Sequence, residues 1–566
     1  MNNVAARQFD TLWGHPKPLW MLFMAEFWER FAFYGIRWAL TLYIVAQFHG
    51  GDASGEKPAS ELYGAYLALV YAGAIFGGYV ADKIIGYQRS ILLGAVVMAI
   101  GLFMIVVPNE LVFKLGLATI IAGNGLFKPN ISTMVGKLYL QGDDRRDSGF
   151  TLFYMGINLG AMVAPILTGW LAERMLGGTS DMPAYKVVFI TSGVGMLISL
   201  VWFWFGRAQL KGVGRPPEGA EGLGRVLMTT IGALVAIPVI YFLLSMGASS
   251  LQWVLTAMFV ILGIMLLAEG VREGAVSRDK TIALLIIFAF NVLFWMFFEQ
   301  AGSSFSFLSD KIVDRDLGAP GGFVWPNAWF QSVNSVAIIT LAPVIAWIWV
   351  AMGRANPSIP RKFGLGLLFN GAAFALLMFA LSQMVVDGKI PFWTLFMVYV
   401  IQTVGELCLS PIGLSMVSKL AAVRDTGLAM GAWFLCTAIG NYVAGAVAAL
   451  SVHQQQDMIG RRTAQRDRAH ERGSVITLQA LGVERRHQGA QRIVHVGIAG
   501  RADLFRRDDV DGDRAVGDRT ILAARPDDDD IAAALIGVGA FGFGRRRLRL
   551  GNRCHRECER RRQQQT

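Results

Sequence analysis

Long apolar runs separated by short polar connections dominate the first 450 residues of the chain. Each run is close to the roughly 20 residues that a helix needs to cross a bilayer, and charged residues are sparse within the runs. The pattern therefore predicts an all-α polytopic membrane protein. Thirteen runs can be recognised, at residues 19–48, 61–81, 90–107, 111–136, 148–173, 187–206, 226–246, 251–268, 280–307, 325–350, 363–386, 391–418 and 427–450.

The basic residues of the connections are unevenly distributed when alternate connections are assigned to opposite sides of the membrane. With the N-terminus in the cytoplasm, the cytoplasmic connections carry 19 Lys and Arg, and the other connections carry seven. Cytoplasmic loops of membrane proteins are enriched in Lys and Arg. We therefore expect a multi-pass protein of the cell inner (cytoplasmic) membrane with a cytoplasmic N-terminus. The first run is too long and too charged to be the apolar core of a cleavable signal peptide.

The longest connection between the early runs, at residues 206–224, is rich in Gly, Pro and charge. The seventh and eighth runs lack ionisable residues until Glu269, so they resemble a lipid-facing pair inserted between two functional bundles. Two helical halves with a binding site between them are typical of transporters. We predict a bundle at 1–208, a linker with an inserted two-helix hairpin at 209–275, a second bundle at 276–452, and a tail at 453–566.

The tail from residue 453 differs in composition from everything before it. It has no Lys, Trp or Tyr, and its longest apolar stretch is the 14 residues 531–544. Because bundles built from paired helices call for a fourteenth span, we expect either a frameshift in the recorded sequence or a natural disordered tail. Cys554, His555 and Cys558 are a weak signal for a metal site, and we predict no metal and no cofactor.

The distribution of net charge along the chain argues against nucleic-acid binding. The formal net charge is +11, but the first 450 residues carry 29 Lys and Arg against 25 Asp and Glu, whereas the tail carries 23 Arg against 16 acids. Most of the excess positive charge therefore lies in the tail. The basic balance is not a nucleic-acid signal, and the expected surroundings of the chain are the lipid bilayer.

The first run carries four charges at bilayer depth. Glu26, Arg30 and Arg37 fall on one narrow helical stripe, with Glu29 and Tyr34 on its flanks. A charge at this depth costs about 2.5 kcal/mol or more, so the stripe should face protein or a watery cavity. A simpler alternative is that Glu26 and Arg30 only neutralise each other, but this leaves Arg37 unexplained.

Three further charges lie within later runs, namely Lys128, Glu299 and Glu406. Because the two acids of the second half have no basic partner in their own helices, we expect Arg37 and Lys128 to be their counter-ions. An ion pair between the halves that can open is a gate, although a static structural pair is the alternative. No His lies within a run, so any proton transfer must use carboxylates. Burial favours a neutral carboxyl group and a nearby cation favours the carboxylate, so conformation can control proton binding.

Several of these residues form a recognisable motif. Glu26, Glu29, Arg30, Phe31 and Tyr34 resemble the E-x-x-E-R-F-x-Y-Y signature of the proton-dependent oligopeptide transporter family, a branch of the major facilitator superfamily. The resemblance extends over residues 20–450. Further matching positions are Gly77, Gly78, Ala81, Asp82 and Gly86; Phe127, Lys128, Pro129 and Asn130; residues 153–160; Phe294, Trp295, Phe298, Glu299 and Gln300; and Gly405 with Glu406.

The resemblance implies a major facilitator fold with two six-helix bundles and an inserted helix pair, the last helix being lost or altered in this sequence. It also implies a monomer that imports di- and tripeptides with protons by alternating access. Glu26, Glu29, Arg30 and Glu299 would couple proton binding to transport. The implied substrate-binding residues are Glu406, Asn158 and Asn334 for the peptide amino terminus, Arg37, Lys128, Tyr34 and Tyr66 for its carboxylate, and Trp433 for the pocket wall. Arg37 with Glu299, and Lys128 with Glu406, would form gating ion pairs.

Two departures from the family pattern stand out. Phe33 replaces the first tyrosine of the signature, which removes one hydroxyl group from the implied site. The missing last span leaves the assembly of the second bundle open. For Asn158, Asn334 and Trp433, packing between helices is the alternative to substrate contact.

Two other functions are compatible with parts of the pattern. A proton-coupled transporter of another small solute, such as nitrate or a carboxylate, is the nearer alternative, although both acids of the signature are present. A membrane-embedded enzyme would need a metal cluster, an activated nucleophile or an acidic motif at the membrane edge. The only acidic cluster is residues 527–530 in the tail, so we expect a protein that is not an enzyme.

Overall fold

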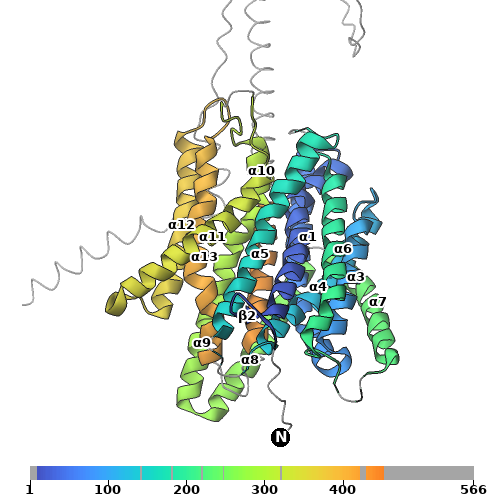
Figure 1. The fold of residues 1–566 in the computed structure, drawn as a ribbon. Helices are drawn as coiled ribbons and strands as arrows, with labels where there is room; N and C mark the ends of the chain where they lie inside the picture. Colours follow the sequence, from blue (N-terminus) through green and yellow to red (C-terminus); the bar gives the residue numbers. More distant parts are fainter. Residues whose placement is uncertain are drawn as a thin grey trace, which may run out of the picture.

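A computed structural model describes residues 9–450, apart from 141–142, 144, 180–182, 218, 220, 247, 319–321 and 421–428. Within these residues, thirteen helices are long and apolar enough to cross a membrane, as the hydrophobic pattern predicts. Figure 1 shows the early helices gathered on one side of the molecule and the later helices on the other. The predictions for the tail, including Cys554, His555 and Cys558, lie outside the described residues.

Six helices form the first half. A two-stranded hairpin, β1 (Thr11–Leu12) and β2 (His15–Pro16), precedes them, and Pro18 lies in the first turn of α1. Pro suits this position because an amide there has no partner within the helix. Asn109 caps α4 by accepting a hydrogen bond from the Val112 amide at 3.1 Å. The helices are α1 (Lys17–Phe48), α2 (Glu56–Val80), α3 (Tyr87–Met104), α4 (Glu110–Lys137), α5 (Arg145–Trp170) and α6 (Tyr185–Gly206).

The two helices between the halves are α7 (Leu223–Ser245) and α8 (Ala248–Glu273). Their residues are largely exposed, as expected for helices that face lipid. α7 packs against α2 and α4, whereas α8 packs against α9 of the second half. The inserted pair therefore contacts both halves.

The second half begins with a helix that is interrupted inside the membrane. α9 (Ala275–Phe298) and α10 (Ser304–Lys311) are joined by the tight turn η5 (Glu299–Gly302), whereas the sequence predicted one continuous run. The break follows from Ser303, whose backbone φ of −126° and ψ of −92° are not helical. The remaining helices are α11 (Trp329–Ala351), α12 (Ile359–Gln383), α13 (Phe392–Leu420) and the helix Ala429–Leu450.

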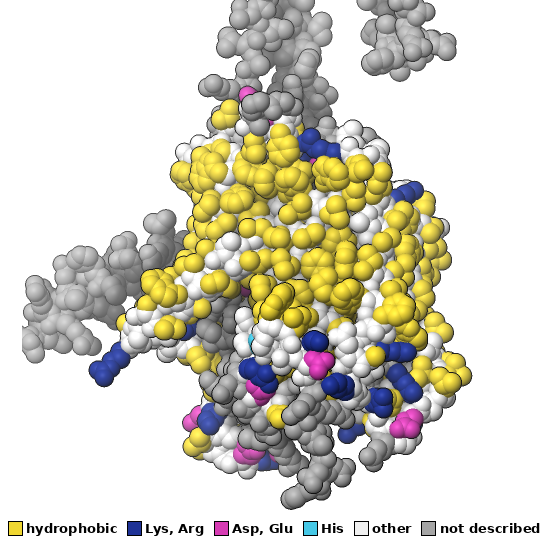
Figure 2. Space-filling model, viewed as in Figure 1, with side chains coloured by type: hydrophobic (Ala, Val, Ile, Leu, Met, Phe, Trp, Pro, Cys, Tyr) yellow, Lys and Arg dark blue, Asp and Glu magenta, His cyan; other side chains and the backbone are white. Residues whose placement is uncertain are grey.

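The exterior has the polarity of a membrane protein. Figure 2 shows a broad band of hydrophobic side chains over the middle and upper part of the visible face, with most of the charged side chains gathered below it, near the N-terminus. Apolar residues in contact with lipid require no polar partner, whereas charged groups stay in water. The molecule is a multi-pass membrane protein, and its division at residues 208 and 275 remains our prediction.

Candidate functional site

The charged residues of α1 form a buried cluster on the face of the helix that meets α4. Arg30 Nε lies 3.2 Å from Glu26 Oε1, one turn away, and Arg30 Nη2 donates a hydrogen bond of 2.5 Å to Glu29 Oε1. Asn124 of α4 donates a further hydrogen bond of 3.0 Å to Glu29 Oε1. All three charged residues are at most 3% exposed. The helical spacing of the sequence therefore produces a desolvated ionic group.

This cluster has an excess of negative charge when both carboxyl groups are ionised. Arg30 supplies one positive charge against Glu26 and Glu29, and Glu26 Oε2 has no hydrogen-bond partner among the described residues. Burying an uncompensated charge is costly. A proton on one carboxyl group, or the approach of a second cation, would remove the excess. Lys128 of α4 lies within electrostatic range of both acids.

One ion pair joins the two halves at the centre of the molecule. Arg37 Nη2 of α1 lies 2.5 Å from Glu299 Oε2, which stands at the interruption between α9 and α10. Arg37 Nε also donates a hydrogen bond of 3.0 Å to the Tyr63 hydroxyl, and its guanidinium carbon lies 5.6 Å from the centre of the Tyr34 ring. The pair is almost completely shielded from solvent.

The other predicted gating pair, Lys128 with Glu406, is not formed between the described side chains. Lys128 Nζ instead lies 4.2 Å from the centre of the Tyr71 ring, and Glu299 is within its electrostatic range. A cation above an aromatic face is attracted by the ring quadrupole. Lys128 is therefore held close to the pair between the halves without being part of it.

Glu406 of α13 forms the acidic end of the site. Its Oε2 accepts a hydrogen bond of 2.9 Å from Asn334 Nδ2 of α11, and the same amide donates to Thr403 Oγ1 at 2.9 Å. Glu299 and Arg37 lie within electrostatic range of Glu406, as does Tyr154 of α5, which is 39% exposed. Acidic groups of the second half thus lie opposite basic groups of the first half.

Three other predicted residues have different surroundings. Tyr66 is buried, its ring stacks on Phe33 at 6.4 Å, and its hydroxyl has no partner among the described residues. Asn158 donates to the Tyr154 carbonyl one turn earlier in α5. Trp433 is 5% exposed and packs 6.3 Å from both Phe288 and Phe363, in the apolar core of the second half.

Sequence reasoning did not assign a role to several residues that contact the charges. Tyr63 accepts a hydrogen bond from Arg37, and Asn124 donates one to Glu29. The Tyr71 ring lies beneath the Lys128 ammonium group. Their positions within apolar helices were the available signal, because a polar group at this depth needs a partner. The ion pair between Glu56 and Lys311 was also missed, since both residues lie at helix ends where charge is ordinary.

Contacts between the halves gather at the ends of the helices away from the N-terminus. The Ser332 hydroxyl donates to the Met162 carbonyl at 2.8 Å, and the Trp329 indole donates to the Ile166 carbonyl at 3.1 Å. The Glu56–Lys311 pair lies at this same end. The described helices are therefore held together at one end, beyond the level of Arg37 and Glu299.

Among the described residues, no group of three or more His, Cys, Asp or Glu could hold a metal ion. The chemistry available at the site consists of two buried carboxyl groups beside Arg30, an ion pair that bridges the halves, and the amide-bound carboxyl group of Glu406 within electrostatic range of Arg37. Such an arrangement can bind protons and a molecule with separated charges.

Comparisons with known proteins show which family the chain resembles. The PTR2 model of the POT family matches residues 88–464. The chain is 38% identical to the peptide transporter YePEPT of Yersinia enterocolitica over 79% of this chain and 90% of that protein. It is 33% identical to dipeptide and tripeptide permease A of Yersinia pestis over 77% of this chain and 84% of the permease.

The fold of the chain is also similar to solved structures of peptide transporters. A crystal structure of a peptide transporter POT in complex with alafosfalin has a TM-score of 0.69 and 33% identity, covering 81% of this chain and 93% of that chain. A POT family transporter in complex with 5-aminolevulinic acid has a TM-score of 0.68 and 31% identity, covering 79% and 92%. The fold is that of the major facilitator superfamily, and the chain belongs to the POT family.

Proposed function

We propose that this protein is a proton-coupled symporter that imports di- and tripeptides across the cell inner membrane by alternating access. The observation that carries the proposal is the Arg37–Glu299 pair, which bridges the halves between a basic and an acidic group of side chains. The relatives named above are peptide transporters, which supports a peptide as cargo. The proposal includes a monomer with a cytoplasmic N-terminus. In that orientation the sealed end faces outward.

A peptide presents opposite charges at its two ends and a variable middle. Glu406, held by Asn334, offers a carboxylate for the peptide amino terminus, with Asn158 on the facing helix. Arg37 and Lys128 offer positive charge for the peptide carboxylate; the Tyr34 ring lies beside Arg37, and we assign Tyr66 to the same end of the peptide. Trp433 would reach the pocket wall only after its contacts with Phe288 and Phe363 rearrange. Fixed charges at the ends and an adaptable middle allow one site to bind many side chains.

Proton coupling follows from the same charges. A proton on Glu299 removes the charge that holds Arg37, so the guanidinium becomes available to the carboxylate of the peptide. Glu26, Glu29 and Arg30 lie on the same helix as Arg37, and Lys128 lies within range of both groups. A proton bound by Glu26 or Glu29 therefore changes the electrostatic potential at Lys128. Protonation and substrate thus act on one connected set of side chains.

Uptake of a labelled dipeptide into proteoliposomes tests the function directly. An acid-outside gradient should drive accumulation above equilibrium, and dissipating the gradient with an ionophore should abolish it. Glu299→Gln should abolish gradient-driven accumulation while exchange of peptide for peptide partly survives. Undiminished acid-driven uptake by Glu299→Gln would contradict the role of this residue, and a lack of dipeptide uptake by the unaltered protein would refute the function.

A second class of cargo has one specific observation in its favour. A POT family transporter similar to this chain has been solved with 5-aminolevulinic acid, whose amine and carboxylate are separated much as in a short peptide. The charges at Glu406 and at Arg37 with Lys128 suit such a molecule. Competition of dipeptide uptake by 5-aminolevulinic acid and by nitrate distinguishes this cargo from an anion, because nitrate offers no amine to Glu406.

A further inference from the structure

An apolar groove lies between the inserted helix pair and the first half, bounded by α2, α4, α7 and α8. Its volume is about 700 Å³. Phe76 of α2 and Val239 of α7 line the groove and are exposed, so it opens toward the membrane. From Met228 to Leu243 it follows α7 for about 22 Å, which exceeds the roughly 15 Å of one bilayer leaflet. Because one acyl chain spans one leaflet, the groove is long enough to hold an extended chain.

Small residues keep this space open. Gly73 of α2, Gly125 of α4 and Gly232 of α7 all line it, and an added Cβ at Gly232 would meet nothing within 4 Å. Among the described lining residues only Thr229 has a polar side chain, and its hydroxyl donates to the Arg225 carbonyl at 2.9 Å. The walls therefore offer hydrocarbon contacts alone. Atoms that line an unfilled space lose dispersion contacts, which an apolar chain restores.

Two basic residues lie at the end of the groove where α7 begins. Lys83 directly precedes the lining residue Ile84 in η2 (Ala81–Ile85), and Arg225 lies one turn before the lining residue Met228. Because α7 packs against η2, both basic residues belong to the same end of the groove. Both are exposed, and neither forms an ion pair with a described residue.

The neighbouring charges leave this end of the groove positive. The nearby acids are Asp82 and Glu221, and the nearby basic residues are Lys83, Arg89 and Arg225. Asp82 accepts a hydrogen bond from a tyrosine hydroxyl of α3, and Arg89 donates to the Glu221 carbonyl at 2.8 Å. This leaves Lys83 and Arg225 available to a phosphate group. Basic clusters at the cytoplasmic membrane surface attract anionic lipids.

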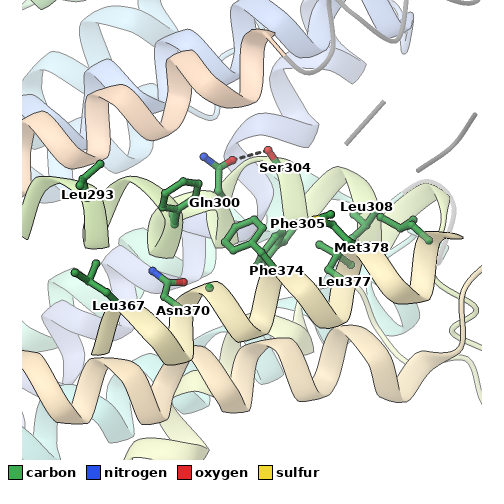
Figure 3. A pocket seen from close by; sticks show the side chains of 13 residues that line it. Leu293, Gln300, Ser304, Phe305, Leu308, Leu367, Asn370, Phe374, Leu377 and Met378 are labelled. Atoms are coloured by element: carbon green, nitrogen blue, oxygen red, sulfur yellow. Dashed lines mark hydrogen bonds between the residues drawn. The ribbon is translucent and has the colours of Figure 1, made fainter. Parts of the chain in front are cut away.

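A second groove provides a comparison, on the outside of the second half between α9–α10 and α12 (Figure 3). Its walls are also mainly apolar, and its volume is about 300 Å³. Ser304 there donates to Gln300 Oε1 at 2.6 Å, and Lys311, which ends α10, is held by Glu56. Apolar walls are thus common to both grooves, whereas the two cations described above lie at the first.

We propose that the groove between the inserted pair and the first half binds one acyl chain of an anionic phospholipid, with the phosphate of its headgroup between Lys83 and Arg225. With the N-terminus in the cytoplasm, as proposed above, this lipid belongs to the cytoplasmic leaflet. Its chain fills the space between α7, α2 and α4, so bound lipid stabilises the position of the inserted pair. The proposal does not depend on which solute is transported.

Lipid retention measured by native mass spectrometry tests the headgroup contacts. The protein is reconstituted in bilayers of phosphatidylethanolamine and phosphatidylglycerol, extracted in mild detergent and analysed for bound lipid. Phosphatidylglycerol should be retained in preference. Lys83→Gln or Arg225→Gln should each weaken its retention about fivefold, the attraction expected of one basic residue at an anionic surface. Lys57→Gln, of an exposed lysine at the other end of α2, should change nothing. No preference for phosphatidylglycerol, or equal losses in all three variants, would overturn the proposal.

A photoreactive lipid locates the acyl chain. Phosphatidylglycerol with a diazirine in one chain is added to the membranes and irradiated, and the labelled peptides are identified. The label should favour the lining peptides of α2 and α7 over those of the groove in Figure 3. Gly232→Phe should suppress this labelling, because the ring occupies the open space. Gly364→Phe is the control, since a Cβ added there also meets nothing within 4 Å and Gly364 lines neither groove.

Three results of this labelling would contradict the site. They are equal labelling of both grooves, unchanged labelling of Gly232→Phe, and equal labelling of the groove by phosphatidylethanolamine that carries the same diazirine. Each would mean that the groove is solvated by the bilayer without selecting a lipid.

Discussion

The buried charges determine what individual residues of this protein can do. Their existence was predictable from the sequence, because Glu26, Glu29, Arg30 and Arg37 interrupt an otherwise apolar helix. Their partners were only partly predictable. The Arg37–Glu299 contact follows from charge balance between the halves, whereas the separation of Lys128 from Glu406 depends on the conformation in which the two halves meet.

Lys128 allows a test of carboxylate recognition at the residue scale. Lys128→Ala should weaken binding of an ordinary dipeptide about tenfold, since a hydrogen bond to a charged group is worth roughly 1.5–3 kcal/mol. A dipeptide with an amidated carboxyl terminus should bind equally to both proteins. Competition against a labelled peptide measures both affinities, and an unchanged affinity for the free carboxylate would exclude Lys128 from the site.

Glu406 allows the complementary test. Glu406→Gln retains the size of the side chain and can still pair with Asn334, but it removes the negative charge that would bind an amino terminus. Affinity for a dipeptide should fall about tenfold or more, for the same reason as at Lys128. An N-acetylated dipeptide provides the control, because its affinity should be insensitive to the change. Parallel losses for both ligands would show that Glu406 supports the fold and not the amino terminus.

At the scale of helices, the hydrophobic pattern predicted the number of spans in the described region and most of their ends. It did not predict the interruption at residues 299–303, because the run from 280 to 307 remains predominantly apolar despite Lys280, Thr281, Asn291, Glu299, Gln300 and the serines at 303, 304 and 306. It also gave no indication of which helices touch. Helix contacts depend on small residues whose neighbours lie far away in the sequence, as at α2 and α4.

Two glycines of α2, one turn apart, allow a test of how the contact between α2 and α4 depends on small residues. An added Cβ at Gly77 would overlap the carbonyl oxygen of Gly125 in α4, whereas at Gly73 it would meet only Ile121, at 3.7 Å. We therefore expect Gly77→Ala to lower the thermal midpoint and the yield of folded protein, because the two backbones must move apart. Gly73→Ala should be tolerated. If thermal unfolding in detergent gave equal midpoints for the two variants, this close approach of α2 and α4 would be refuted.

At the scale of the whole molecule, the two halves meet through few ionic contacts. The Glu56–Lys311 pair joins the start of α2 to the end of α10 at the sealed end, and the lysine is about half exposed. Sequence reasoning placed both residues in ordinary polar connections, so their relationship became visible only in the assembled bundle. Such a pair adds modestly to closure.

Charge exchange tests whether this pair helps to close the sealed end. Glu56→Lys should reduce the uptake rate roughly twofold to fivefold, in keeping with a pair worth about 0.2–1 kcal/mol. The double change Glu56→Lys with Lys311→Glu should restore most of the rate, since the attraction returns with its polarity reversed. Initial rates in proteoliposomes, corrected for protein content, give the comparison. A double variant no better than the single one would mean that the contact is incidental.

Because the helix is interrupted between α9 and α10, the Arg37–Glu299 and Glu56–Lys311 contacts lie at opposite ends of the short helix α10. The break at residues 299–303, which begins with Glu299, is the pivot, and Lys311 lies at the far end of the eight-residue α10, about 12 Å from Ser303 along the axis. A tilt of about 15° at the pivot would move the far end by roughly 3 Å, enough to part a salt bridge. Release of Arg37 when Glu299 takes up a hydrogen ion would therefore be transmitted to the sealed end through the roughly two helical turns of α10.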